Sequence, residues 1–60
     1  MRFRVSVRWR PDEQSPVCSS SWIVKWVRGD MFCLILEDGA GLTTSIPLAL
    51  IEWVQMERIG

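Results

Sequence analysis

Apolar and basic side chains alternate over the first ten residues, MRFRVSVRWR. After Met1, every odd position holds Phe, Val or Trp, and every even position except Ser6 holds arginine. A period of two places alternate side chains on opposite faces of a strand. The segment therefore predicts a strand with one apolar face and one basic face, the latter formed by Arg2, Arg4, Arg8 and Arg10.

The length of 60 residues predicts a single small domain over residues 1–60. A chain of this size buries only about 60% of the surface that its unfolded form exposes, so its stability margin is thin. Apolar residues make up 48% of the chain and include four tryptophans, each of which can bury a large area. We expect part of this surface to be shared with a second chain, and hence homo-oligomerisation. The tryptophans are Trp9, Trp22, Trp26 and Trp53.

Three further segments are expected to form strands, and a loop precedes the first of them. Residues 11–16 are polar and bracketed by prolines, which predicts a long exposed loop. Residues 22–28 are rich in β-branched and aromatic residues, and on a regular strand Trp22, Val24 and Trp26 would share one face. A short serine-capped helix ending at Gly29 is the competing interpretation. Residues 31–37 predict a central strand covered on both faces, closed by the hairpin dipeptide Asp38-Gly39, and residues 42–46 complete a three-stranded meander.

The tail, residues 47–60, is ambiguous because Pro47 and the residues that follow it also suit a helix. Its charged residues scatter around a helical wheel and leave no clean apolar stripe. We therefore expect a single 3-10 turn over residues 47–50 and then a last strand. The alternative is a C-terminal helix on a four-stranded antiparallel sheet, an α+β fold. A last strand beside the first would let Glu52 and Glu57 form cross-strand pairs with the arginines.

The expected order is a strand, a long polar loop, a three-stranded meander, a short turn after Ile46-Pro47 and a final strand. This order resembles that of the Src-homology-3-like small barrels, whose corresponding corner the Ile46-Pro47 step looks like. The resemblance covers most of the chain and implies an all-β fold, a small five-stranded barrel with a short 3-10 turn before the last strand. Eukaryotic members bind proline-rich peptides through a groove lined with tyrosines, whereas this chain has no tyrosine.

Residues 45–52, SIPLALIE, are similar to the end of the plasmid-borne type II dihydrofolate reductases, which build one pore from four such barrels. In that family a Gln-Ile-Tyr-Pro segment lines the pore. Here Thr44 or Ser45 occupies the place of the glutamine, and no tyrosine follows Ile46. A reductase of this kind is therefore only a remote alternative.

Catalytic and metal-binding signatures are missing from the sequence. The chain has no histidine and only two cysteines, Cys18 and Cys33, so we expect no metal site and no cofactor. Asp30 and Asp38 have the ordinary role of turn residues, and no glycine motif suits a phosphate. We expect no enzymatic activity.

The absence of a secretion or membrane signal predicts a reducing cytoplasm with both cysteines as small core residues, although a Cys18–Cys33 bridge would be possible in an oxidising compartment.

Two functional classes fit these observations. The first is a non-catalytic interaction module, such as a small bacterial or phage accessory protein, that binds a protein partner or itself through exposed tryptophan and the arginines. The second is a binder of single-stranded nucleic acid or RNA, with arginines on phosphates and tryptophans stacked on bases. An isoelectric point of about 6.1 favours the first. The candidate binding residues are Arg2, Arg4, Arg8, Arg10, Trp22, Lys25, Trp26 and Arg28.

Overall fold

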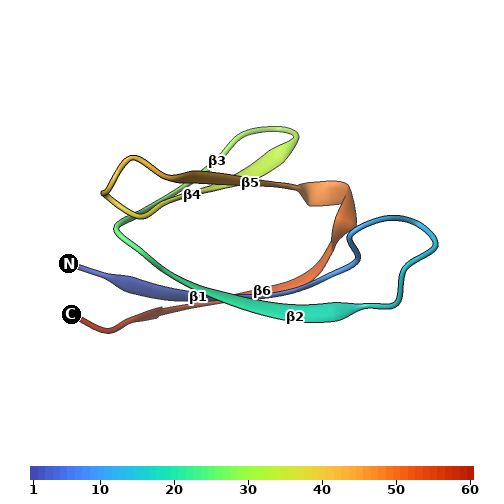
Figure 1. The fold of residues 1–60 in the computed structure, drawn as a ribbon, viewed down its shortest axis with the longest axis horizontal. Coiled ribbons are helices and arrows are strands. Elements are labelled where there is room, and N and C mark those ends of the chain that lie inside the picture. Colours follow the sequence, from blue (N-terminus) through green and yellow to red (C-terminus); the bar gives the residue numbers. More distant parts are fainter.

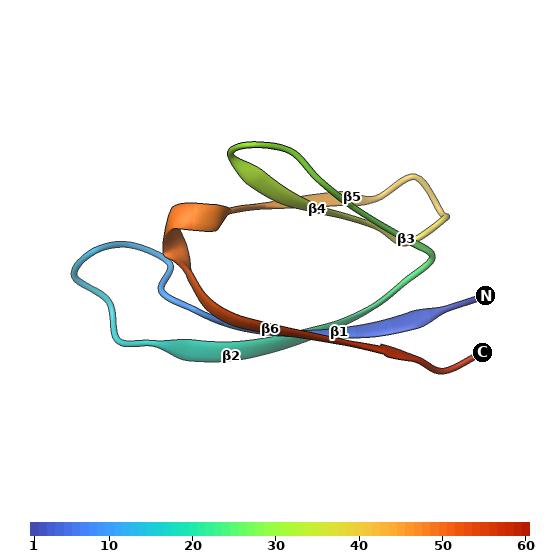
Figure 2. The same ribbon diagram turned by 180° about the vertical axis from the view of Figure 1, so that it is seen from behind.

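Two three-stranded antiparallel sheets form the fold in the computed structural model, which describes residues 1–60. The first sheet has the order β2-β1-β6 and the second the order β3-β4-β5. Figures 1 and 2 show the sheets as two layers, with the two termini side by side at one end. No strand ladder joins the sheets, so they do not close into a barrel. The elements are β1 Phe3–Trp9, β2 Cys18–Val24, β3 Trp26–Gly29, β4 Cys33–Glu37, β5 Thr43–Pro47, the 3-10 helix η1 Leu48–Leu50 and β6 Ile51–Arg58.

The all-β class is confirmed, and so is the two-faced character of the first strand. β1 is the middle strand of its sheet and pairs with β2 on one side and β6 on the other. Val5 and Val7 are buried, whereas Arg4 and Arg8, at the alternate positions, are exposed. The apolar face of β1 is therefore the face turned toward the second sheet.

The second predicted strand is divided, because the chain bends at Lys25 as it passes from the first sheet to the second. The Lys25 N–H donates to the Glu37 carbonyl at 2.8 Å, which starts the pairing with β4. Val24 and Val27 both face the core across this bend, so the alternation shifts by one residue. Trp22 therefore packs against the core and Trp26 is exposed, and the prediction that they share one face is wrong. The serine-capped helix is also wrong, since Cys18–Val24 is extended.

The predicted meander is confirmed, with β4 between β3 and β5. β4 begins only at Cys33, because the Asp30 carboxylate accepts the N–H groups of Phe32 and Cys33 and holds a turn there. Leu36 is buried, but the other residues of β4 are only half-buried. The prediction of a strand covered on both faces is wrong, because only one face of this sheet packs against another layer.

The connection from β4 to β5 is longer than the tight turn that Asp38-Gly39 predicts. The Asp38 carboxylate accepts N–H groups from Ala40 at 2.7 Å and Leu42 at 3.2 Å, so the loop extends to residue 42. Gly39 has φ of 87°, in the left-handed region that favours glycine. A Cβ there would lie 2.9 Å from the Lys25 side chain, which gives Gly39 a second, steric reason to be glycine.

The short turn before the last strand is confirmed. Pro47 precedes η1, and Ile51 returns to extended backbone with φ of −91° and ψ of 127°. The remaining residues form β6 along β1, and the alternative of a C-terminal helix with an α+β fold is wrong. Pairing with β1 favours the strand, since it satisfies the backbone groups that β6 turns toward β1 while the polar residues of β6 stay exposed.

The core between the sheets is small. Its five buried residues come from both layers, and they are Val5, Val7, Val24, Leu36 and Ile46. Cys18 and Cys33 are free and half-buried, so neither belongs to this buried set, although they were predicted as core residues.

Leu36→Ala tests the dependence of the fold on this core, because Leu36 is only 1% exposed. Removing a buried leucine side chain costs about 2–5 kcal/mol. A domain of this size rarely has more than about 3–5 kcal/mol of stability. We expect a large fraction of the variant to be unfolded in water at room temperature, as measured by urea titration with tryptophan fluorescence.

Leu42→Ala is the matched control, since Leu42 is 65% exposed in the loop before β5. Its free energy of unfolding should lie within about 0.5 kcal/mol of that of the unmodified chain. Equal losses in the two variants would contradict the assignment of Leu36 to the core.

Candidate interaction surface

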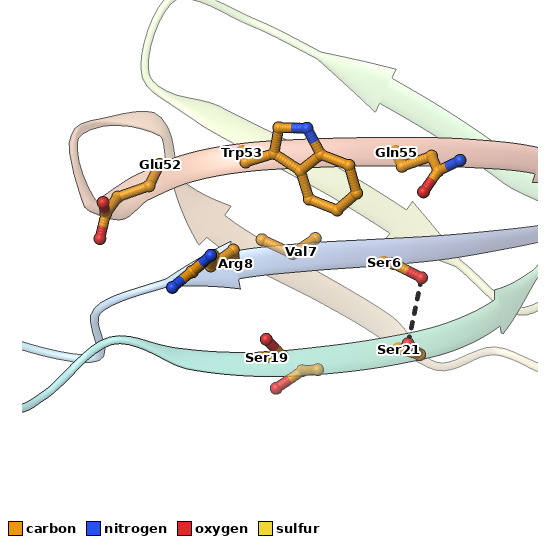
Figure 3. Close-up of a pocket in the computed structure, with 9 residues that line it drawn as sticks. Ser6, Val7, Arg8, Ser19, Ser21, Glu52, Trp53 and Gln55 are labelled. Carbon is orange, nitrogen blue, oxygen red and sulfur yellow. Dashed lines mark hydrogen bonds between the residues drawn. The ribbon is translucent and has the colours of Figure 1, made fainter.

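The outward side of the β2-β1-β6 sheet carries a shallow polar hollow. Arg8 on β1 lies between Ser19 on β2 and Trp53 on β6. The next row along the strands places Ser6 between Ser21 and Gln55. Figure 3 shows these side chains gathered on one face, with the Trp53 ring beside the strand that carries Arg8. We call these six residues the Arg8–Trp53 face. The hollow has a volume of about 660 Å³ and is also lined by Val7, Ser20 and Glu52.

Hydrogen bonds hold the serines of β2 in place. The hydroxyls of Ser6 and Ser21 are 3.1 Å apart across the strands. On the opposite side of the sheet, the indole N–H of Trp9 donates to the Ser20 hydroxyl at 3.2 Å. Alternation thus divides the serine run, with Ser20 toward the core and Ser19 and Ser21 on the outward face.

Arg8 has no carboxylate partner, unlike Arg4 on β1 and Arg10 just beyond it. Arg4 lies 3.5 Å from Glu57, and Arg10 lies 4.0 Å from Glu52. The predicted cross-strand pairing of the arginines with Glu52 and Glu57 is therefore confirmed. Arg8 takes part in none of the three ion pairs of the structure, because Trp53 occupies the position opposite it on β6. Its exposed guanidinium keeps its donors available for a ligand.

Several of the other predicted binding residues lie apart from this face. Lys25, Trp26 and Arg28 belong to the bend and to β3. The Lys25 ammonium lies 5.1 Å from the centre of the Trp26 ring, within the range of a cation–π contact. Arg28 forms an ion pair with Glu37 on β4. Arg2, next to the C-terminal Gly60, is exposed at the end of β1. The eight predicted residues therefore form no single surface.

Trp53 and Gln55 were missing from the predicted site residues, although the sequence contained a signal for them. Matching Glu52 and Glu57 to the arginines of the first strand already implies that the last strand runs beside the first. The residues between the two glutamates must then include side chains on the same face. The register has a bulge at Arg8/Trp9, which no pattern in the sequence indicated, so the exact partner of Arg8 could not be read from the sequence.

Two exposed carboxylates, those of Asp12 and Asp30, accept hydrogen bonds within turns. The Ser15 hydroxyl and the Gln14 N–H both donate to Asp12 and lower the pKa of its carboxyl below 3.8. The N–H groups of Phe32 and Cys33 lower the pKa of Asp30 in the same way. A lowered pKa keeps both groups ionised at neutral pH, which is unsuited to a general acid. No group of three or more His, Cys, Asp or Glu side chains could hold a metal ion. The structure has no helix that is both long enough and apolar enough to cross a membrane.

Comparison of the chain with protein-family models, with curated proteins and with solved structures gives no match.

Asp30→Asn tests the role of the turn carboxylates through the pH dependence of stability. The pKa of Asp30 is lower in the folded chain than its ordinary value of 3.8. The contribution of Asp30 to folding stability is therefore complete above pH 3.8 and is lost as the pH falls through the pKa of the folded chain. We expect the unmodified chain to lose more thermal stability between about pH 5 and about pH 2 than Asp30→Asn does. Circular dichroism melts at both pH values measure this difference, and equal losses would contradict it.

Proposed function

We propose that this protein is a non-catalytic interaction module that binds an acidic segment of a protein partner on the Arg8–Trp53 face. The observation that carries the proposal is the exposed guanidinium of Arg8, which has no carboxylate partner and lies opposite the half-exposed Trp53. Arginine and tryptophan are the residues that most often supply binding energy at protein interfaces.

The chemistry of the hollow supports a carboxylate ligand. Arginine presents a planar fork of donors that matches the two oxygens of a carboxylate. The Gln55 amide and the hydroxyls of Ser19 and Ser21 supply further donors and acceptors beside it. Trp53, 52% exposed, offers a flat apolar surface to the part of the ligand that adjoins its charge.

A single-stranded nucleic acid is the second candidate, and the same pair of residues favours it. An arginine beside an exposed tryptophan can hold a phosphate while a base stacks on the ring. Against it, Glu57 and Glu52 already compensate Arg4 and Arg10, which leaves few cations for a run of phosphates. We therefore place the acidic protein segment first.

The fold supports a related proposal, that the chain is a variant of the Src-homology-3-like arrangement. β2 and β3 would then count as one bent strand, since only Lys25 separates them and its N–H continues the pairing. The order of the remaining strands and the 3-10 turn after Ile46-Pro47 agree with this interpretation. The proposed ligand face does not depend on it.

Arg8→Gln tests the proposed binding face. We expect it to weaken the binding of a glutamate-rich peptide by about tenfold or more, as for the loss of a charge-assisted hydrogen bond of about 1.5–3 kcal/mol. Arg28→Gln, which removes the same charge from the other sheet, is the matched control and should leave binding unchanged. Fluorescence anisotropy of a labelled peptide measures both.

Titration with a labelled oligothymidylate at about 50 and about 200 mM salt separates the two candidates. Binding of the oligonucleotide that falls steeply with salt, together with no binding of the peptide, would move the assignment to nucleic acid. Equal effects of Arg8→Gln and Arg28→Gln would contradict the proposed face for either ligand.

A further inference from the structure

β6 is a free edge of the β2-β1-β6 sheet, and it differs from the other three edges. Edge strands that avoid pairing with other chains are short or carry charges, proline or polar residues. β3 has four residues and includes Arg28, β5 begins with three polar residues and ends at Pro47, and β2 contains three serines. β6 is the longest, with eight residues and no proline or glycine; its charged residues, Glu52, Glu57 and Arg58, lie toward its two ends and leave the uncharged sequence WVQM at its centre.

Val54 and Met56 of β6 are exposed although they lie on the core side of the sheet. Val54 is opposite Val7 and Met56 is opposite Val5, so all four share one face. Val5 and Val7 are buried by the second sheet, but Val54 is 47% and Met56 55% exposed. The second layer therefore does not cover the sheet as far as its β6 edge.

The backbone of β6 offers hydrogen-bonding groups at the same two residues. The Ile59 N–H donates to the Arg2 carbonyl, and bonded and non-bonded pairs alternate along an antiparallel ladder. Glu57, Gln55 and Trp53 therefore direct their N–H and C=O groups toward β1. Val54, Met56 and Arg58 direct theirs away from β1, toward the free edge.

We propose that a second copy of this chain pairs antiparallel along β6, with Gln55 on the two-fold axis. This register places Val54 of each copy opposite Met56 of the other. In both copies the backbone groups of these two residues point to the free edge and have no partner within the chain. Their exposed side chains then pack across the axis on the core side of the joined sheet.

The neighbouring registers fit less well. A two-fold axis at Val54 would place Met56 of one copy beside Glu52 of the other. An axis at Met56 would place Arg58 of one copy opposite Val54 of the other. A shift by one residue would bring residues from opposite faces together. Only the axis at Gln55 gives both Val54 and Met56 an apolar partner in the other copy.

This association goes beyond the proposed ligand binding and uses different atoms. It involves the outward backbone of β6 and the side chains on its core side, whereas the ligand face uses Arg8 and the opposite side of the sheet. Pairing along β6 would join two Arg8–Trp53 faces into one six-stranded surface. Arg8→Gln should leave the association unchanged, so failure of either proposal is seen separately.

Cysteine crosslinking tests the register directly. In a chain carrying Cys18→Ala and Cys33→Ala, Gln55→Cys places two cysteines at a non-bonded pair, with Cα atoms about 4.5 Å apart and within disulfide reach. We expect nearly complete dimer formation with oxidised glutathione at micromolar protein, on a non-reducing gel. Val54→Cys alone and Met56→Cys alone should stay monomeric on the same gel, while a mixture of the two should crosslink. Circular dichroism first establishes that each variant is folded.

Met56→Lys tests the association without a crosslink. A lysine at this position would lie beside Val54 of the second copy, and we expect the dissociation constant of the dimer to rise by about tenfold or more in analytical ultracentrifugation. Met31→Lys is the matched control, because Met31 is exposed in the turn between β3 and β4 and should have no effect.

Three outcomes would overturn the proposal. The first is a monomeric mass of the unmodified chain up to high micromolar concentration. The second is a dimer that Met56→Lys leaves as stable as Met31→Lys does, which would place the interface elsewhere. The third is efficient crosslinking of Val54→Cys or Met56→Cys with itself but not of Gln55→Cys, which would refute the axis at Gln55.

Discussion

Pairing of β1 on both of its sides is the constraint on which the rest of the structure depends. β2 follows β1 after a loop, and β6 lies at the far end of the chain, so β1 brings both ends of the sequence into one sheet. Its alternation then fixes what each face contains. Val5 and Val7 supply the core between the layers, and Arg8 and Ser6 define the two rows of the outward face.

The small core explains how the surface is arranged. Five buried residues must hold two sheets together, and the contacts at their margin come from half-buried aromatic and aliphatic residues such as Trp9 and Trp22. The layers are too narrow to cover every apolar residue of so hydrophobic a chain. Apolar side chains are therefore left exposed in several places, among them the loop residues Met31 and Leu42, and at Val54 and Met56 of β6 they coincide with a free backbone edge.

Those parts of the fold that rest on local pattern could be predicted from the sequence. The alternation of residues 2–10 predicted β1, and Ile46-Pro47 with the scattered charges after it predicted a turn and a last strand. The division of the second strand could not be predicted, because the bend at Lys25 arises from packing Val24 and Val27 into the same core. That bend places Trp22 against the core and leaves Trp26 exposed. The regular alternation assumed from the sequence was wrong by one residue at this point, and Trp22 was therefore wrongly included among the binding residues. Of that site, the outward position of Arg8 was predictable, whereas its bulged partner on β6 depends on long-range register.

Charge counted along the sequence overstates the basic surface of this chain. Four arginines precede residue 11, but β6 returns two glutamates to the same face, where they lie close to Arg4 and Arg10. Such exposed pairs contribute little to stability, about 0–1 kcal/mol each, yet they neutralise the charges around them. Of Arg4, Arg8 and Arg10, only Arg8 thus remains unpaired, and it lies opposite Trp53. Nucleic-acid affinity grows with the number of phosphates that are neutralised together. One guanidinium suffices for one carboxylate, so the ion pairs made by its neighbours are what favour an acidic protein segment on this face.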